Sequence, residues 1–191
     1  MRRAQSVSRF SAAAALAAAL ALAVGIAVAE PPPPIGHVAT PEQIAGWNID
    51  VLPDGTGLPV GRGTAREGKA IYDAACAACH GADGQGGTSL PGPPLVGGIG
   101  TLATAHPKKT VGSYWPYATT LFSYIRRAMP YNAPESLGAD QLYAVVAYLL
   151  FRNGIAGQDT VLDQASLPQV KMPNRNGFID IYGREAHGIW R

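Results

Sequence analysis

Cysteine is scarce in this sequence of 191 residues, which contains only Cys76 and Cys79. A disulfide between two residues so close together closes a loop that is too short to brace a fold. A structural zinc site needs about four protein ligands, typically including a second Cys or His pair at similar spacing. The histidines outside this region, His37, His106 and His187, are scattered singly. The two cysteines therefore indicate neither a disulfide scaffold nor a zinc site.

Alternating strand patterns and runs of positive charge are also lacking. Without a strand–helix–strand pattern around them, the cysteines do not indicate a thioredoxin-like redox site. The formal net charge of +2 includes three arginines near the N-terminus, Arg2, Arg3 and Arg9. Subtracting these three from the 15 basic residues leaves 12 against 13 acidic ones, a net charge near −1. No basic tract predicts binding to nucleic acid.

Cys76-Ala77-Ala78-Cys79-His80 is a C-x-x-C-H motif that uses both cysteines of the chain. In such a motif the two thiols form thioether bonds with the vinyl groups of one haem, and the adjacent histidine is the proximal iron ligand. The sequence therefore predicts one covalently bound haem c, attached at Cys76 and Cys79, with His80 on the iron.

Residues 1–29 predict a signal peptide. The arginines precede an Ala/Leu-rich stretch of 18 residues, Ala12 to Ala29, which ends in the A-x-A pattern Ala27-Val28-Ala29. A retained membrane anchor is the alternative, because 18 residues can just span a bilayer. We expect cleavage, a periplasmic location and no membrane attachment afterwards. Export agrees with the motif, since haem is attached to C-x-x-C-H outside the bacterial cytoplasmic membrane.

Helical periodicity predicts a mostly α-helical domain at residues 61–153. Thr64-Ala65-Arg66-Glu67 fits a capping box and begins a helix that runs to Cys76. Two further helices are expected at about 119–128 and 139–152. Arg126 and Arg127, near the end of the second helix, suit its dipole, and docking of a partner is the alternative role.

The segment from Gly81 to Gly100 contains eight glycines and three prolines and predicts a loop. Within it, the carbonyl of Pro93 is a candidate acceptor for the second N–H of the His80 imidazole, and Leu95 a candidate to cover the haem face. A hydrogen bond of this kind orients a ligand imidazole and raises its basicity. Ordinary loop structure is the alternative interpretation of the same residues.

Two segments flank the predicted domain. Residues 30–60 are rich in proline and glycine and predict an extended N-terminal arm, which apolar residues between Trp47 and Leu52 attach either to its own domain or to a partner. Residues 154–191 form a C-terminal tail. The hypothesis is that both segments wrap a partner, with candidate anchors at Trp47, Phe178, Tyr182 and Trp190; self-packing or tail disorder is the alternative.

In the order of its motifs the chain resembles the class I cytochromes c over about residues 60–153. The matching features are Gly68 and Tyr72 before the C-x-x-C-H motif, Gly92-Pro93-Pro94-Leu95, Met129 in a loop, and Tyr148 on the last helix. The resemblance implies an all-α class I cytochrome c fold in which the Gly68 face closely meets the last helix. It also implies haem contacts from Pro93, Leu95 and Trp115.

A methionine is expected as the sixth iron ligand, because a neutral, soft thioether favours Fe(II). Met129 lies in the turn before the last helix, where the family pattern requires a ligand, so His80 and Met129 are the predicted iron ligands. Met172 lies in the tail, and gap-filling is the alternative role for either methionine. His106 is a further alternative, as a second histidine ligand.

A narrower resemblance is to the cytochrome subunit of the sulfane dehydrogenase of the thiosulfate-oxidising Sox system. Six segments carry it: 39–44, 50–59, 112–118, 124–130, 161–163 and 171–178. The resemblance implies a molybdenum-cofactor dehydrogenase subunit as electron donor, acting on sulfane sulfur or sulfite, and a downstream cytochrome or oxidase as acceptor. The chain itself would then be an electron-transfer subunit without substrate chemistry of its own.

Two functional alternatives remain beside this one. A stand-alone cytochrome c shuttle has the same closed iron site but no stable partner. A catalytic or ligand-sensing haem protein keeps one position on the iron open for a small molecule. An occupied sixth position at Met129 distinguishes electron transfer from ligand chemistry.

Overall fold

The computed structural model describes residues 36–87, 90 and 92–179, so the predicted signal peptide lies outside the described residues. Internal contacts divide the chain into Met1–Thr40 and Pro41–Arg191, and all elements named below belong to the second part. The main helices are α3 (Ala65–Ala75), α6 (Ala118–Ala128) and α7 (Ala139–Arg152), with shorter helices α2 (Pro41–Trp47), α4 (Ala77–His80) and α5 (Val111–Tyr114) and the 3₁₀ helix η1 (Leu167–Gln169). The mostly helical prediction is confirmed.

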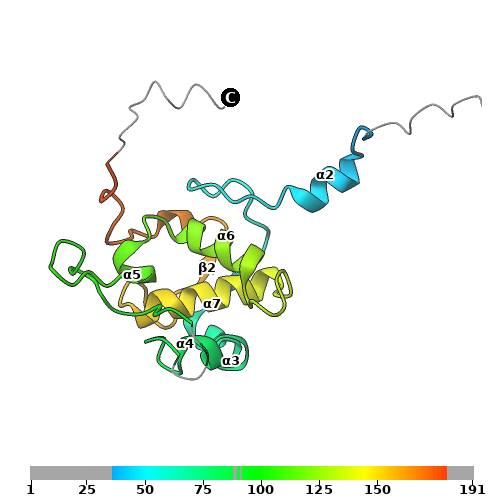
Figure 1. Cartoon of the computed structure of the whole chain (residues 1–191). Coiled ribbons are helices and arrows are strands. Elements are labelled where there is room, and N and C mark those ends of the chain that lie inside the picture. The colour runs from blue at the N-terminus through cyan, green and yellow to red at the C-terminus, as the bar shows by residue number, and fades with distance from the viewer. Residues whose placement is uncertain (1–35, 88–89, 91, 180–191) are drawn as a thin grey trace, which may run out of the picture. The chain divides into compact units, whose positions relative to one another are not determined.

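Helix α7 forms the centre of the domain. Every residue from Leu142 to Leu150 is buried, although helical periodicity alone indicated one apolar face. The reason is that α3, α6 and the short strand β1 (Arg62–Gly63) all pack against it. Figure 1 shows α6 and α3 on opposite sides of α7.

The crossing of α3 and α7 is unusually close at Gly68. A Cβ atom there would lie 1.9 Å from the carbonyl oxygen of Ala144, so only glycine fits. One turn further on, the rings of Tyr72 and Tyr148 lie 5.1 Å apart. The close crossing implied by the family resemblance is therefore present. The predicted capping box is present too, with Thr64 and Glu67 each accepting the other's backbone N–H.

Helix α6 carries a buried face that includes Leu121, Phe122 and Ile125, and its Phe122 ring lies 4.7 Å from that of Tyr143 on α7. The helix ends at Met129, whose backbone N–H donates to Ile125 O (3.0 Å). A proline disfavours the helical conformation of the residue before it, and Met129, which precedes Pro130, accordingly adopts an extended one. Met129 is thus the first residue after the helix, and Pro130, which follows it, is buried.

The N-terminal arm is not extended throughout, because it contains helix α2. None of the α2 residues is buried, and the side chain of Trp47 is 88% exposed. The following residues pack on the domain: Val51 joins the core, and Thr119 donates a hydrogen bond to the carbonyl of Pro53 (3.2 Å). The arm thus packs on its own domain from about Ile49 onward.

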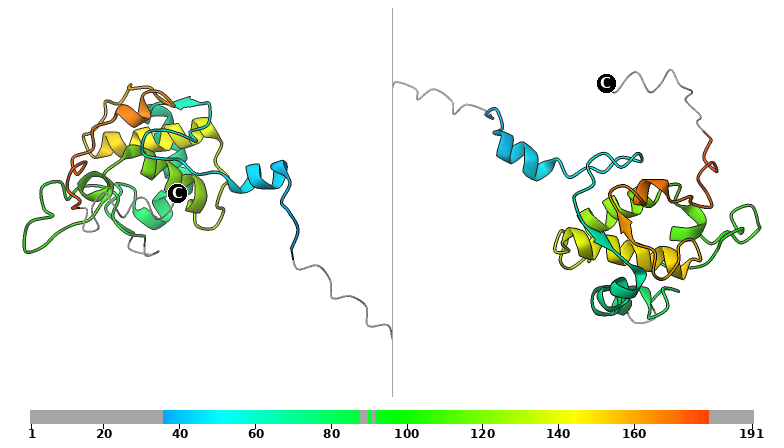
Figure 2. Two further views of the ribbon diagram at one scale, coloured as in Figure 1. Left: turned by 90° about the horizontal axis from the view of Figure 1, so that it is seen from above. Right: turned by 180° about the vertical axis from the view of Figure 1, so that it is seen from behind.

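The tail also contributes to the core. Leu162, Leu167 and Met172 are each at most 3% exposed and belong to the same cluster as α7. Strand β2 (Leu162–Asp163) pairs antiparallel with β1, a feature that the all-helical prediction missed. Figure 2 shows this part of the chain over α7 from two further sides. The core therefore extends beyond the predicted domain limits of 61 and 153.

Within residues 36–87, 90 and 92–179, none of the helices combines the length and apolar character that crossing a membrane requires.

Candidate haem-binding site

The C-x-x-C-H motif lies where α3 passes into α4. Cys76 separates the two helices, and its carbonyl accepts from the backbone N–H groups of Cys79 (3.1 Å) and His80 (2.9 Å). The tight turn brings both sulfur atoms and the imidazole onto one short segment. Both cysteines are half-buried free thiols. They are available for two thioether bonds.

The second nitrogen of the His80 ring has a defined partner. Its Nδ1 lies 2.8 Å from the carbonyl oxygen of Pro93. Because a carbonyl can only accept, Nδ1 carries the proton, and Nε2 is left with its lone pair for a metal. The predicted contact between Pro93 and His80 is present, and it orients the imidazole as a ligand requires.

Several backbone hydrogen bonds attach the loop that carries Pro93 to the motif. The N–H of Gly92 donates to Cys79 O (3.0 Å), and that of Gly86 donates to His80 O (2.9 Å). A Cβ atom at Gly92 would lie 2.3 Å from Cys79 O and 3.0 Å from His80 Nδ1. The loop therefore approaches the histidine so closely that no side chain fits at position 92.

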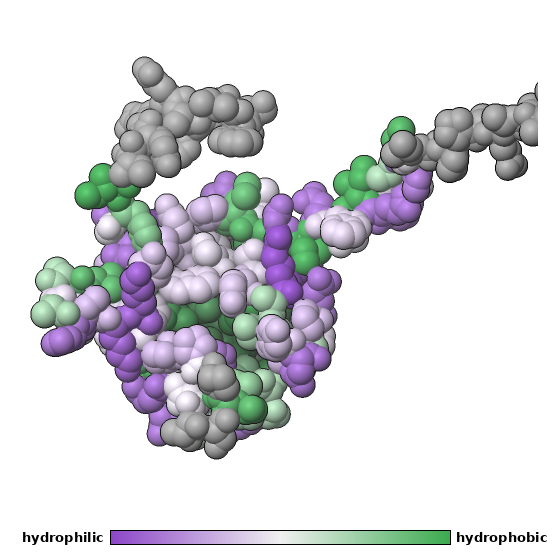
Figure 3. Space-filling model, viewed as in Figure 1, coloured by the Kyte–Doolittle hydropathy of each residue, from purple (hydrophilic) through white to green (hydrophobic). Residues whose placement is uncertain are grey.

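The side chains around the motif are apolar and are only partly buried. Burial, followed by the neighbouring Cys79, raises the pKa of the Cys76 thiol to about 11, so Cys76 is a neutral thiol at pH 7. Figure 3 shows a hydrophobic recess in the face between α6 and the α3–α4 region. Half-buried apolar side chains at the edge of the core include Ile71, Cys76, Ala77, Leu95, Trp115 and Met129. An apolar recess beside two free thiols and an oriented imidazole fits haem c.

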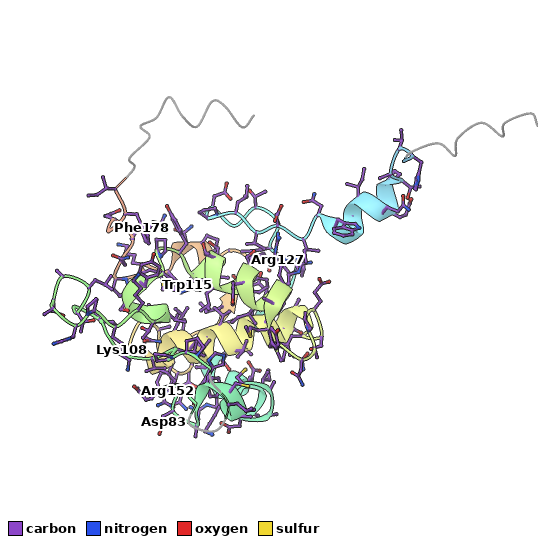
Figure 4. The ribbon with its side chains drawn as sticks, in the orientation of Figure 1. Asp83, Lys108, Trp115, Arg127, Arg152 and Phe178 are labelled. Atoms are coloured by element: carbon purple, nitrogen blue, oxygen red, sulfur yellow. The ribbon has the colours of Figure 1, made fainter. Side chains whose placement is uncertain are left out.

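Leu95 and Trp115 reach the edge of the core from different elements. Leu95 follows Pro93 in the loop, and its N–H donates to Gly84 O (2.8 Å). Trp115, labelled in Figure 4, lies between α5 and α6 and packs edge-to-face on Tyr124 at 5.5 Å. Both positions agree with the predicted haem contacts, which remain predictions.

The three candidates for the sixth ligand lie in different environments. Met172 is 3% exposed and fills the core, so its thioether is surrounded by apolar side chains. His106 is exposed in a surface loop, where its backbone N–H donates to Thr104 Oγ1 (3.3 Å). Met129 is half-buried at the end of α6 and packs against the core. This environment favours Met129 over the other two.

Two residues at the end of α7 that the sequence did not indicate contact the loop from Gly81 to Gly100, which carries Pro93. Arg152 donates to the Asp83 carboxylate (3.1 Å) and to Tyr148 Oη (3.0 Å), and Figure 4 shows Arg152 beside Asp83. Asn153 hydrogen-bonds to the backbone of Leu95 and Gly97. In the sequence the two residues signal only a helix end, and nothing in their pattern points to a loop about 60 residues earlier.

Comparisons with known proteins agree with this site. A family model described as Cytochrome c matches residues 65–151. A chain in the crystal structure of the sulfane dehydrogenase SoxCD from Paracoccus pantotrophus is 40% identical, with a TM-score of 0.72. The match covers 81% of this chain and 76% of that one.

The thiosulfate dehydrogenase of Allochromatium vinosum is 30% identical over 122 residues, which are 61% of this chain. The match spans 38% of that curated relative's own length. The sequence identity to the SoxCD chain is higher, and that match covers more than two thirds of each of the two chains. Together with the matched family model, it establishes that this chain belongs to the cytochrome c family and carries covalently bound haem c.

Proposed function

We propose that this protein is a periplasmic monohaem electron carrier that accepts electrons from a molybdenum-containing sulfur-compound dehydrogenase subunit and passes them to the respiratory chain. The observation that carries the proposal is the 40% identity, over 81% of this chain, to a chain of a sulfane dehydrogenase. The likeness to a thiosulfate dehydrogenase supports the same class of electron donor. The substrate class is therefore reduced sulfur compounds, oxidised by the partner.

When bound, haem supplies an iron that exchanges one electron between its ferric and ferrous states. The role of this chain is to bind, orient and shield it. Cys76 and Cys79 anchor the group, and His80 presents Nε2 because Nδ1 donates to Pro93. Apolar side chains around the motif limit access of water, which lowers the reorganisation that accompanies each electron transfer.

Met129 is the proposed sixth ligand. Its position after α6 is fixed by the buried face of that helix, and Pro130 prevents the helix from continuing. A thioether in the sixth position raises the reduction potential and blocks small ligands from the iron. The role of Met129 therefore separates an electron carrier from a haem enzyme or ligand sensor.

The experiment that tests the proposal uses the tagged chain, purified with its haem from its own source cells grown on thiosulfate. We expect a molybdenum-containing subunit to co-purify and reduced sulfur compounds to convert the haem to its ferrous spectrum. A chain that purifies alone, and that a separate dehydrogenase fraction reduces, is a stand-alone shuttle. Absence of sulfur-dependent reduction in both preparations contradicts the proposal.

Helix α2 is the proposed contact of the arm with the dehydrogenase subunit. Trp47 is 88% exposed and Ile44 54%, whereas the residues that follow α2 pack on the domain. Buried Trp side chains commonly dominate the binding energy of interfaces. Trp47→Ala should therefore reduce the yield of co-purified dehydrogenase without changing the melting temperature of the isolated cytochrome. An unchanged yield contradicts this role.

Of the three candidate anchors in the tail, Phe178 is described by the structure and is less favoured by its surroundings than Trp47. Phe178 is 52% exposed and packs edge-to-face on Tyr114 at 5.3 Å, so part of its surface is already used within the chain. Tyr182 and Trp190 lie outside the described residues.

A further inference from the structure

Asn153, the residue that follows α7, is a buried polar side chain with all its amide groups paired. It is 8% exposed. Its Nδ2 donates to the carbonyls of Leu149 (2.8 Å) and Leu95 (3.1 Å), and its Oδ1 accepts from the N–H of Gly97 (3.1 Å). The bond to Leu149 stays within α7, and the other two join the helix to the loop that carries Pro93.

Ending the helix does not require this side chain. The backbone N–H of Asn153 already donates to the carbonyls of Leu149 and Leu150, and the N–H of Gly154 donates to Phe151 O (2.9 Å). These bonds and the left-handed conformation of Gly154 complete an ordinary helix end. The side chain is therefore free to act on the loop, at positions 56 and 58 residues earlier in the chain.

The loop segment bound by Asn153 begins two residues after Pro93. Leu95 and Val96 also donate to Gly84 O (2.8 and 3.0 Å), and Thr110 Oγ1 donates to Gly97 O (2.5 Å). The carbonyl groups of Leu95 and Pro93 belong to one short run of backbone. A shift of Leu95 and Gly97 away from α7 would therefore displace the Pro93 carbonyl from His80 Nδ1.

We propose that Asn153 is a positioning residue for the haem: through Leu95 and Gly97 it keeps the Pro93 carbonyl within hydrogen-bond distance of His80 Nδ1. Since that bond raises the basicity of the imidazole, Asn153 tunes the iron ligand from the end of α7. The inference rests on His80 as iron ligand and is independent of the identity of the electron donor.

The decisive variant is Asn153→Asp, made in the full chain with its haem. The substitution keeps the size of the side chain but turns the donor that faces two carbonyls into an acceptor. The bond to Leu95 O is therefore lost, whereas the N–H of Gly97 keeps an acceptor. Two quantities are measured on the purified protein without a partner: the exchange of the His80 Nδ1 proton with D₂O in the ferrous state, by NMR, and the reduction potential.

We expect the Nδ1 proton to exchange about two- to tenfold faster, since the net contribution of one hydrogen bond corresponds to a change of that size in an equilibrium. We also expect the potential to rise relative to that of a control variant that adds the same negative charge, because a less basic imidazole stabilises ferric iron less. Gln141→Glu is the matched control: it makes the same amide-to-acid change at the other end of α7 and still accepts from the N–H of Gly138. Both quantities should keep their parent values in this control.

Thr110→Val is the second variant, in case Asn153→Asp yields no holoprotein. It removes the bond to Gly97 O from the α5 side and leaves α7 intact. Exchange and potential should change in the same direction. If the folded variants melt at lower temperature but keep the parent exchange rate and potential, Asn153 merely stabilises the fold and the inference is wrong. That outcome does not affect the proposed sulfur-dependent electron transfer, which is measured with the partner.

Discussion

At the scale of single residues, the surroundings of His80 explain how the chain orients its predicted iron ligand. Pro93 fixes the protonated nitrogen at 2.8 Å, and Gly92 permits the close approach of the loop that carries Pro93. A glycine-rich loop thereby performs the orienting function that a carboxylate provides in many metal sites. The backbone supplies an acceptor without placing a charge in an apolar recess.

Met129→Ala is the sharpest test at this scale. The oxidised parent protein should show the long-wavelength charge-transfer band of an iron–thioether bond, and the variant should lose it. The reduced variant should bind CO rapidly, whereas the parent should not, because its sixth position is occupied. Met172→Leu is the matched control: Met172 is 3% exposed in the core, so the band should be retained. A band that persists in Met129→Ala contradicts the assignment.

Two buried tyrosines make the fold sensitive to alkaline pH. Burial raises the pKa of Tyr72 and of Tyr143 from 10.0 to about 12. Each hydroxyl donates to a carbonyl, Tyr72 to Gly81 O and Tyr143 to Pro59 O. The neutral form is therefore favoured in the folded state, so this contribution to stability is fully present below pH 10 and is lost between pH 10 and about 12.

We expect the free energy of unfolding to fall as the pH rises through this window. Urea unfolding of the holoprotein at several pH values measures it. The double variant Tyr72→Phe/Tyr143→Phe is less stable at pH 7 because it lacks the two hydrogen bonds, but its stability should decline less steeply above pH 10. An equally steep decline would assign the effect to other groups.

At the scale of elements, the crossing of α3 and α7 connects the haem motif to the core. The close contact at Gly68 and the packing of Tyr72 on Tyr148 fix the direction in which α3 ends, and therefore where Cys76 begins the motif. The position of the haem attachment site thus depends on a contact two turns earlier in the helix.

Gly68→Ala should destabilise the protein by about 1–3 kcal/mol, the usual cost of overpacking. Alanine is the better helix former by about 1 kcal/mol, so a loss of stability can only come from the clash with Ala144 O. Lys69→Ala is the control: the Lys69 side chain is 62% exposed in an ion pair with Asp73, so its loss should leave the free energy of unfolding nearly unchanged. Urea unfolding measures both. A stable Gly68→Ala protein would mean that the helices can separate at little cost.

The cationic end of α6 is bound by the arm. Arg127 forms an ion pair with Asp50, and Arg126 donates to Ile49 O (3.3 Å). Figure 4 shows Arg127 at the end of α6 near the arm. Exposed pairs of this kind contribute little stability, with a median of about 0–1 kcal/mol. The two arginines are therefore better described as contacts to the arm than as a free docking surface.

At the scale of the whole molecule, a part of each flanking segment belongs to the folded domain. Val51 from the arm and Leu167 from the tail lie in the same core as α7. A partner-docking test that removes residues 155–191 would therefore also remove core residues, and loss of the complex would not identify an interface. A point substitution such as Trp47→Ala avoids this ambiguity.

Leu167→Ala measures how much the tail stabilises the domain. The side chain is 0% exposed, so the truncation should cost about 2–5 kcal/mol in the free energy of unfolding. Val161→Ala is the control, because this neighbouring apolar residue is 47% exposed and its loss should cost far less. Similar unfolding curves for both variants would show that the tail adds no stability.

The three main helices and the haem motif were predictable because they depend on short-range patterns. The capping box of Thr64 and Glu67 and the turn from Cys76 to His80 involve neighbours in the chain, and Pro93 lies 13 residues from His80 within one loop. The strand pair could not be predicted. Each strand has two residues, which is too short for an alternating pattern. The two strands are also far apart in the sequence, since Arg62 pairs with Asp163.

Residue identity alone determined the haem attachment and the helical class and predicted the histidine ligand, since each follows from chemistry or periodicity that is local in the chain. Only the tertiary structure distinguished the buried Met172 from the half-buried Met129, and only it brought Asn153 to Leu95 and Gly97. The physical reason is that burial and long-range hydrogen bonding depend on which segments pack together. That choice is made by the whole core around α7.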